Sequence, residues 1–175
     1  LFGRFMGLNK TLISKQQKYL TIVSTFAVDL LSMNSVNDIV WHAAKNVVAQ
    51  LGFDDVVIYL FNEQKNKLIQ AASYGNKNPC EYEILKPIEI ELGQGVVGKV
   101  ALSQQGIIIQ DTSLEPDYIV DDEIRLSELT VPLVVDDRLI GVIDSEHPAK
   151  NFYDEEQLST VVAIASMMAT QISRF

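Results

Sequence analysis

Both ends of this chain carry apolar residues at alternating intervals of four and three positions, and this repeat limits the possible folds more than any other feature. Counted from Leu1 in this way, nine of the first ten positions are apolar. A mean spacing of 3.5 residues is typical of a helix that buries one stripe along its length. The repeat predicts a long helix within residues 1–34. Gly3 and Gly7 each destabilise a helix by about 1 kcal/mol relative to alanine, so firm helix is expected from Asn9. The ten positions are Leu1, Phe5, Leu8, Leu12, Gln16, Tyr19, Val23, Phe26, Leu30 and Met33.

The same spacing recurs near the C-terminus, over residues 158–175. Asp154, Glu155 and Glu156 precede it, and acidic side chains favour a helix N-terminus because they complement the helix dipole. We expect an output helix over residues 154–175. Each stripe could pack on the chain's own sheet, on a second copy of the chain, or on both, and we predict a parallel homodimer through the two terminal helices. The residues assigned to that contact are Leu12, Tyr19, Val23, Phe26, Leu30, Val161, Ala165, Met168 and Ile172.

The stretch between the terminal helices alternates helical segments with short apolar runs typical of strands. A helix is expected over residues 35–52, with Ser35 or Asn37 as its N-cap and Gly52 as its terminator. The short segment between Gly93 and Gly106 also has the pattern of a helix, and its glycines are interpreted as turn residues. This order of elements predicts an α+β fold with a mostly antiparallel sheet. Strands are expected at 55–62, 67–74, 88–92, 107–111, 129–137 and 138–144.

Charge and cysteine content exclude several functions. The chain has 14 Lys and Arg against 23 Asp and Glu, and a net charge of −9 disfavours nucleic acid as a partner. Cys80 is the single cysteine, so it forms neither an internal disulfide nor a multi-cysteine metal site, and a reducing, cytoplasmic location is expected. We predict no metal site. Because the chain begins with Leu1, we expect a piece of a longer protein, and a membrane segment upstream of residue 1 stays open.

Residues 144–147, Asp-Ser-Glu-His, have the side chains of a hydrolase site. Successive residues of a strand point to opposite faces, so Asp144 and Glu146 are expected on one face and Ser145 and His147 on the other. A Ser-His-Asp relay needs the histidine within hydrogen-bond reach of both partners, which neighbours on one strand do not provide. We therefore assign no catalytic residue.

Several short motifs in the second half of the chain together resemble a GAF domain. They are GQGVVG at 93–98, EPDY at 115–118, SELTVPL at 127–133, GVID at 141–144, and Phe152 before an acidic helix start. Each motif is short, but their order is specific, and residues 35–74 fit the first half of the family. The longer stretch GVIDSEHPAKNF is similar to GAF modules that precede histidine kinases or other output domains in bacterial signalling proteins. The parent protein is therefore expected to be a sensor histidine kinase.

The resemblance implies a profilin-like, six-stranded antiparallel sheet with helices on both sides and the terminal helices packed together on one face. It divides the chain into a signalling helix at 1–34, a GAF core at 35–153 and an output helix at 154–175. It also implies a small-molecule pocket on the other face, beneath the acid-rich connection at 112–128, because long loops in compact domains are often functional. The pocket residues expected are Tyr59, Val96, Val97, Asp111, Tyr118, Ser127, Asp144 and Glu146.

The function implied is a sensory module that binds a small molecule or relays a conformational signal to the downstream domain. The alternative is a GAF domain without a pocket, which only dimerises and transmits a signal; its sign would be a site filled by Tyr59, Val96 and Tyr118. The fold does not choose between them.

Three known branches of the family were compared with this sequence. The cyclic-nucleotide branch has an acidic pair where this chain has Glu156 and Gln157, and bilin-binding members attach the pigment through a cysteine that Cys80 does not match in position. No covalently bound cofactor is therefore expected, and the ligand stays unknown. The free methionine sulfoxide reductases resemble one another in several cysteines that attack and resolve the sulfoxide, whereas this chain has one. We therefore expect no enzymatic activity in this chain.

Overall fold

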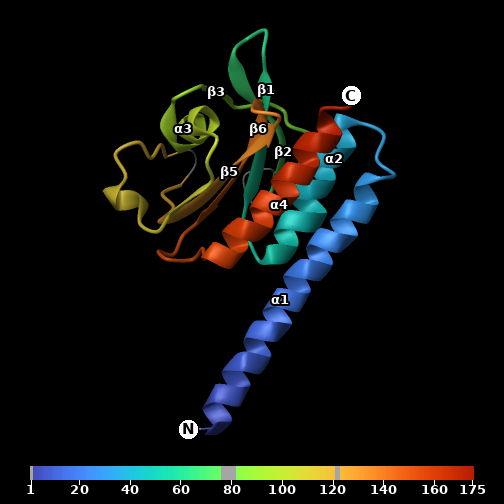
Figure 1. The fold of residues 1–175 in the computed structure, drawn as a ribbon. Helices are drawn as coiled ribbons and strands as arrows, with labels where there is room; N and C mark the ends of the chain where they lie inside the picture. The colour runs from blue at the N-terminus through green and yellow to red at the C-terminus, as the bar shows by residue number, and fades with distance from the viewer. Residues whose placement is uncertain (1, 76–81, 121–122) are drawn as a thin grey trace.

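The computed structural model describes residues 2–75, 82–120 and 123–175, with side chains of the first helix described from Ser14 onward (Figure 1). Its centre is a six-stranded sheet in the order β3-β2-β1-β6-β5-β4, in which every neighbouring pair is antiparallel. The strands are β1 Val56–Asn62, β2 Lys67–Tyr74, β3 Glu89–Glu91, β4 Ile107–Ile109, β5 Ser127–Val135 and β6 Arg138–His147. The predicted α+β class and antiparallel six-stranded sheet are confirmed.

Helices cover both faces of the sheet. The first, second and last helices, α1 (Phe2–Leu30), α2 (Val36–His42) and α4 (Glu155–Ile172), pack on one face, and α3 (Gly95–Ser103) lies on the other (Figure 1). Each face has its own apolar core. The larger core joins Phe26, Ile143 and Ile164 with their neighbours, and the smaller joins Val57, Val100 and Val142.

The helix predicted over residues 35–52 forms, but it is not a regular α-helix. The Ser35 side chain caps its start by accepting a hydrogen bond from the Asp38 N–H, and Gly52, at φ 83°, ends it. Between these points the α-helical turns pass into a π-helix at Ala43–Val47 and then a 3-10 helix at Val48–Leu51. The apolar periodicity predicts that a helix forms, but it does not predict the hydrogen-bond type of single turns within it.

The first helix begins earlier than expected and extends beyond the body of the domain. It runs from Phe2, so Gly3 and Gly7 do not delay its start to Asn9. Two glycine penalties of about 1 kcal/mol are small beside the cooperative propagation of a 29-residue helix. The N-terminal half projects away from the sheet in Figure 1, while the C-terminal half lies along the other helices.

Most positions assigned to a dimer contact lie in the chain's own core. Tyr19, Phe26, Leu30, Val161, Ala165 and Met168 are buried there, and Val23 and Ile172 pack against them. The Leu12 side chain lies outside the described residues. The 3.5-residue stripe is therefore used within the chain, which a periodicity alone cannot distinguish from pairing with a second copy. The homodimer itself stays a prediction. In the part of the chain that the structure describes, no helix combines the length and apolar character needed to cross a membrane.

An ion pair joins the first helix to the start of the last. Lys15 Nζ lies 2.6 Å from Asp154 Oδ2 and 3.7 Å from Glu156 Oε2. Asp154 is also the N-cap of α4, and its side chain and that of Gln157 form a reciprocal capping box. Partial burial opposes ionisation of Asp154, but the hydrogen bonds from Lys15 and from the Gln157 backbone outweigh it and lower the pKa of this carboxyl group. The charged form of Asp154 therefore stabilises the junction of α1 and α4.

Replacing Asp154 with Asn should remove an acid-sensitive part of the folding free energy. A lowered folded-state pKa contributes stability that is complete above the unfolded-state value, near 3.9, and is lost as the pH falls through the folded-state value. Because Asp154 is partly exposed, we expect wild type to exceed Asp154→Asn by about 0.5–1 kcal/mol at neutral pH. Urea unfolding should show this difference shrinking below pH 4. A difference that is equal at pH 7 and pH 2.5 would contradict the assignment.

Gly141 marks the closest approach of two central strands. A Cβ atom at this position would lie 2.1 Å from the Tyr59 carbonyl oxygen on β1. We expect Gly141→Ala to lower the free energy of unfolding by about 1–3 kcal/mol, because the strands would have to move apart. Gly52→Asn is a matched control, since nothing lies within 4 Å of its added Cβ and asparagine tolerates the left-handed conformation. Equal midpoints in urea for both variants would contradict this reading.

Candidate functional site

A cavity of about 190 Å³ lies on the face of the sheet that carries α3. The strands β1, β3, β5 and β6 form its floor and one side, and the start of α3 forms another. The connection over residues 111–126, here called the strap and described except at residues 121–122, crosses it through Tyr118, Ile119 and Val120. The complete lining is Tyr59, Ile88, Glu89, Ile90, Gln94, Gly95, Val96, Val97, Tyr118, Ile119, Val120, Glu128, Asp144 and Glu146.

Three carboxylic acids from two adjacent strands lie together in the cavity wall. Glu128 of β5 pairs with Glu146 of β6, and Thr130 of β5 pairs with Asp144 of β6. Alternate residues of a strand share a face, so this register brings Glu128, Asp144 and Glu146 to the cavity face. All three acids are buried. Thr130 Oγ1 donates a hydrogen bond to Asp144 Oδ1 at 2.7 Å and lies 3.4 Å from Glu128 Oε1.

The region around these acids holds more buried negative than positive groups. Asp55 is also buried and forms a 2.5 Å ion pair with Arg125 Nη1. Among the described residues, four carboxyl groups and one guanidinium are therefore buried in this part of the fold. Burying a carboxylate is costly unless hydrogen bonds or positive charge offset the lost hydration. The cavity wall is consequently suited to a positively charged group.

The remaining walls are mostly apolar, apart from the start of α3. The N-cap of α3, Gln94, and the first residues of the helix, Gly95, Val96 and Val97, all line the cavity. The first N–H groups of a helix have no partner within the helix and attract negative charge. Gly95, at φ 60°, begins the first turn of α3, and a Cβ there would lie 2.8 Å from Ile119 Cδ1. Glycine at this position lets the strap pack directly against α3.

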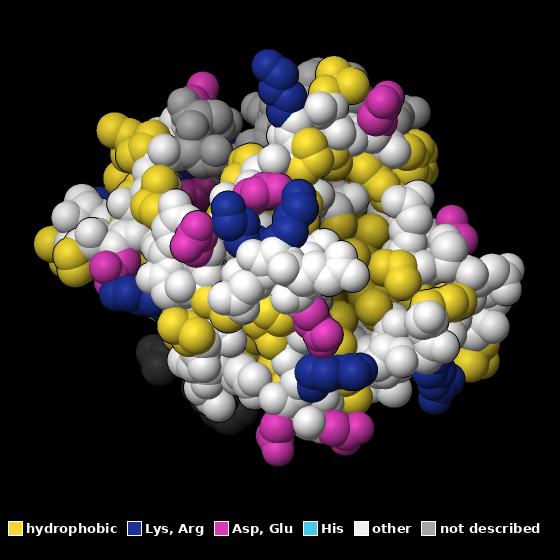
Figure 2. Space-filling view, turned by 90° about the horizontal axis from the view of Figure 1, so that it is seen from above, with side chains coloured by type: hydrophobic (Ala, Val, Ile, Leu, Met, Phe, Trp, Pro, Cys, Tyr) yellow, Lys and Arg dark blue, Asp and Glu magenta, His cyan; other side chains and the backbone are white. Residues whose placement is uncertain are grey.

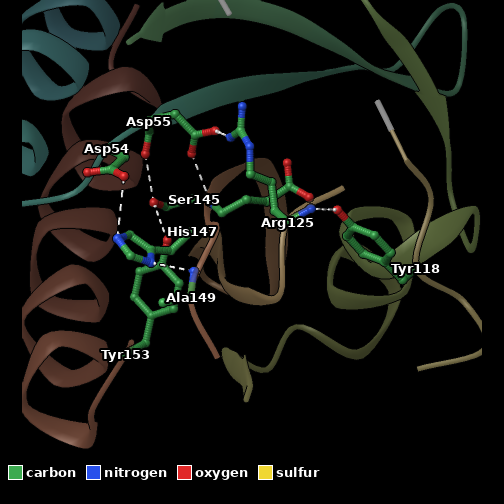
Figure 3. A network of polar contacts seen from close by, with 9 residues as sticks. Asp54, Asp55, Tyr118, Arg125, Ser145, His147, Ala149 and Tyr153 are labelled. Carbon is green, nitrogen blue, oxygen red and sulfur yellow. Dashed lines mark hydrogen bonds and ion pairs between the residues drawn. The ribbon is translucent and has the colours of Figure 1, made fainter. Parts of the chain in front are cut away.

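Tyr118 connects the strap to the acidic wall. Its hydroxyl accepts a hydrogen bond from the Arg125 backbone N–H at 3.0 Å (Figure 3). Burial, together with the charge of Glu146 and a hydrogen bond to its side chain, raises the pKa of Tyr118 above its usual range. The hydroxyl therefore stays protonated and donates a hydrogen bond to the side chain of Glu146. The strap is held further by an ion pair of Asp117 with Lys99 on α3 and by a 2.5 Å hydrogen bond from Thr112 Oγ1 to the Arg125 carbonyl.

Six of the eight residues expected in the pocket line the cavity: Tyr59, Val96, Val97, Tyr118, Asp144 and Glu146. Asp111 does not, because its side chain caps the short helix at Thr112–Leu114 and pairs with Lys150 at 2.7 Å. Ser127 does not either, because strand alternation turns it away from the cavity and its hydroxyl donates to the Ala149 carbonyl at 2.7 Å. Both instead contact the turn that follows β6, Asp111 through Lys150 and Ser127 through Ala149.

Glu128, the third acid of the wall, was not among the expected pocket residues. It lies one position before the strand predicted at 129–137, in the SELTVPL motif, and continuing the strand alternation back to it places it on the face opposite Leu129. The apolar residues of the strap and of β3 were missed for a different reason. Ile88, Ile90, Ile119 and Val120 become neighbours only through the tertiary fold.

The hydrolase-like residues at 144–147 are kept apart by the strand. Ser145 Oγ is buried between the Asp55 carbonyl, at 2.6 Å, and the Tyr153 hydroxyl, at 2.7 Å. The His147 ring stacks on Phe152 at 3.6 Å, and its Nδ1 accepts the Ala149 N–H (Figure 3). Asp144 faces the cavity on the other side of the sheet. Among the described residues, no group of three or more His, Cys, Asp or Glu is arranged to hold a metal ion, and Cys80 lies outside them.

The surface at the top of the molecule, in the orientation of Figure 1, carries charges of both signs. Figure 2 looks down on the molecule of Figure 1 and shows basic and acidic side chains next to one another near the middle of this face. The hairpin of β1 and β2 contributes Lys65 and Lys67, which lie 3.1 and 3.5 Å from Glu89 on β3. Glu89 is exposed, whereas the other acids of the cavity lining are buried. It is therefore a rim residue, and its neighbours are basic.

Solved structures with the same fold include GAF domains of larger proteins and free methionine-R-sulfoxide reductases. The GAF domain of an Acinetobacter phosphoenolpyruvate-protein phosphotransferase superposes with a TM-score of 0.78 at 22% identity, covering 89% of this chain and 92% of that one. The free methionine-R-sulfoxide reductase of Neisseria meningitidis, solved in complex with its substrate, gives 0.77 at 21% identity, covering 89% and 88%. At sequence identities this low, the structural similarity shows that these proteins share a fold with this chain.

Sequence similarity corrects one expectation. The free methionine-R-sulfoxide reductase of Saccharomyces cerevisiae is 27% identical over 114 residues, which are 65% of this chain and 58% of that protein. The prediction of no enzymatic activity, based on the single cysteine, is contradicted by this relative and by the reductases among the structural neighbours. Counting cysteines is therefore too narrow a criterion for a fold that free methionine-R-sulfoxide reductases share. The chain spans 58% of the length of this yeast reductase and 42% of the length of Protein YtsP of Bacillus subtilis, another curated relative that it matches.

The family assignment rests on most of the chain. The sequence model of the GAF domain matches residues 35–174, from the N-cap of α2 to the last turn after α4. The sheet order, the helices on both faces and the cavity beneath the strap lie within this range. The chain therefore belongs to the GAF domain family.

Proposed function

We propose that this chain is a sensory GAF module whose cavity binds a small zwitterion of the free amino acid class, with free methionine sulfoxide as the first candidate. The observation that carries the proposal is the group of three buried carboxylic acids in the wall of an otherwise mostly apolar cavity. A buried acidic wall recognises a cation, and an ammonium group can donate a hydrogen bond to each of several acceptors.

The start of α3 and the apolar residues of the cavity suit the carboxylate and the side chain of an amino acid. The N–H groups at the start of α3 suit a carboxylate, and the apolar residues Val96, Val97 and Ile119 suit an uncharged side chain. Cavities for drug-sized ligands measure roughly 300–1,000 Å³. This one, at about 190 Å³, suits a smaller molecule. The names of the reductase relatives supply the candidate, because they act on free methionine-R-sulfoxide.

The cavity also favours ligand binding over the alternative of a purely dimerising module. That alternative would have Tyr59, Val96 and Tyr118 filling the site, whereas these residues surround an open volume. Two of the three acids, Asp144 and Glu146, lie on β6, the strand that leads into α4 through the turn at 148–154. A bound ligand can therefore act on the base of the exit helix. The downstream histidine kinase stays a prediction.

Binding should depend on the ligand's ammonium group and on the acidic wall. We expect Asp144→Asn and Glu128→Gln to weaken binding of free L-methionine-R-sulfoxide by about 10-fold or more, since a charged hydrogen bond contributes about 1.5–3 kcal/mol. Isothermal titration calorimetry measures the affinity. Glu63→Gln, an exposed change on the β1–β2 turn, is the matched control and should bind as wild type.

The N-acetyl derivative of the same sulfoxide separates this recognition from simple hydrophobic binding. It keeps the sulfoxide and the carboxylate but loses the positive charge, so its affinity should be at least 10-fold lower by the same estimate. Equal binding of the free and acetylated compounds would overturn the proposal. Binding of L-methionine as tightly as its sulfoxide would leave the amino acid class standing and remove the sulfoxide from the recognition.

Reduction of the bound sulfoxide is the second candidate function, favoured by the reductase relatives. A single thiolate can take the sulfoxide oxygen, which releases the thioether methionine and leaves a sulfenic acid. Two thiols of an external reductant such as dithiothreitol would then restore the thiol, forming one disulfide and one water. Cys80 is the one thiol in the sequence that could take this part.

Chromatographic detection of methionine from the free R-sulfoxide with dithiothreitol tests this candidate. If the chain is a reductase of this kind, wild type should form methionine faster than Cys80→Ser, which should match the protein-free background. Asp144→Asn should slow turnover through weaker binding. Background rates for both wild type and Cys80→Ser would reject reduction and leave the binding proposal unaffected.

A further inference from the structure

We propose that Asp55 is a positioning residue that couples the strap and the acidic wall of the cavity to the start of the exit helix α4. The ligand-dependent part of this inference rests on the proposed function, whereas the link between the strap and α4 does not. Asp55 lies immediately before β1, outside the cavity lining, and is buried. Asp55 bonds the strap and β6 directly, and Ser145 of β6 continues the network to Tyr153, just before α4 (Figure 3).

The two carboxylate oxygens of Asp55 contact the cavity side of the network. Oδ2 pairs with Arg125 Nη1 at 2.5 Å, and Oδ1 accepts the Glu146 backbone N–H at 2.8 Å. Arg125 lies one residue before the end of the strap, and its own N–H donates to the hydroxyl of Tyr118. Glu146 and Tyr118 both line the cavity. One carboxylate thus holds the backbone of a wall residue and the anchor of the strap.

The backbone carbonyl of Asp55 contacts the helix side. It accepts a hydrogen bond from Ser145 Oγ at 2.6 Å, and the same oxygen of Ser145 lies 2.7 Å from the Tyr153 hydroxyl. The Tyr153 ring is buried against Phe53 in an edge-to-face contact with centroids 5.2 Å apart. The next residue, Asp154, is the N-cap of α4 and the partner of Lys15. The path from the cavity therefore ends where the two terminal helices are joined.

Because the Asp55 network is buried, a movement of one of its residues is passed on to the others. Hydrogen bonds in a low-dielectric interior are strong, and losing one partner of a buried polar group is costly. Both oxygens of the Asp55 carboxylate are engaged, so a shift of Arg125 or Glu146 toward a ligand requires a shift of Asp55 or the loss of a bond. Ser145 contacts the main-chain carbonyl of Asp55, and Tyr153 contacts Ser145, so both would follow a shift of Asp55. The coupling is reciprocal by thermodynamic linkage.

Hydrogen exchange in the ligand-free protein tests the link directly. Tyr153→Phe removes one hydroxyl from the helix end of the path, and Tyr19→Phe is the matched control. Tyr19 is also buried and its hydroxyl bonds Gln157 of α4, beyond the end of the path through Asp55, Ser145 and Tyr153. We expect Tyr153→Phe to speed exchange of the Arg125 and Glu146 amides at least 3-fold more than Tyr19→Phe does. Equal changes in both variants would overturn the proposed link.

Ligand affinity tests the functional half. Neither Ser145 nor Tyr153 lines the cavity, so a merely structural role would leave binding unchanged. We expect Ser145→Ala and Tyr153→Phe to change the Kd for free L-methionine-R-sulfoxide at least 3-fold, with Tyr19→Phe unchanged. An unaltered Kd in both variants would overturn the coupling. If wild type does not bind this compound, the proposed function fails, and the exchange experiment still decides whether Asp55 links the strap to α4. These mild variants are preferred to Asp55→Asn, which removes a buried charge and can prevent folding.

Discussion

The pairing of β5 with β6 is the contact on which both the fold and the site depend. Its register places apolar side chains such as Leu129 and Ile143 against the helices and acidic side chains on the opposite face. The long hairpin therefore serves two cores of different chemistry at once. A slip of one residue would exchange the faces, burying the acids against α4 and exposing the apolar residues. The buried apolar face thus holds the acidic group of the cavity in place.

Keeping three acids in the cavity wall works against folding, because each carboxylate gives up hydration. The fold offsets this with fixed partners: Thr130 at Asp144, Tyr118 at Glu146, and Arg125 behind the wall at Asp55. Active and binding sites commonly hold such groups at the expense of stability. The strap therefore has two duties, since it covers the cavity and also supplies the buried guanidinium and the tyrosine that stabilise the acids.

The sequence allowed the fold to be predicted because its signals are local. Alternation in IEIEL and RLIGVID, the caps at Ser35 and Asp154, and the stripes of the terminal helices each report on a few neighbouring residues. Six cavity residues followed from the family resemblance. Asp55 and Arg125 could not be paired in advance, because they are 70 positions apart and only the packed sheet brings them together. The stripes were ambiguous for a related reason, since a periodic apolar face does not say whether its partner is the same chain or another.

The same cavity can serve a sensor or an enzyme, because recognition of a small zwitterion is needed for both. A sensor and an enzyme differ in which state of the protein or ligand the binding free energy stabilises. In an enzyme it must stabilise a transition state next to a reactive group, whereas in a sensor it must favour one arrangement of a mobile element. The acids here are connected through Asp55, Ser145 and Tyr153 to the N-cap of α4. That connection contributes nothing to sulfoxide chemistry, but it gives the exit helix a direct mechanical dependence on the cavity wall. A chain of this family that reduced its ligand would therefore still be able to report its presence, and the two functions need not exclude one another.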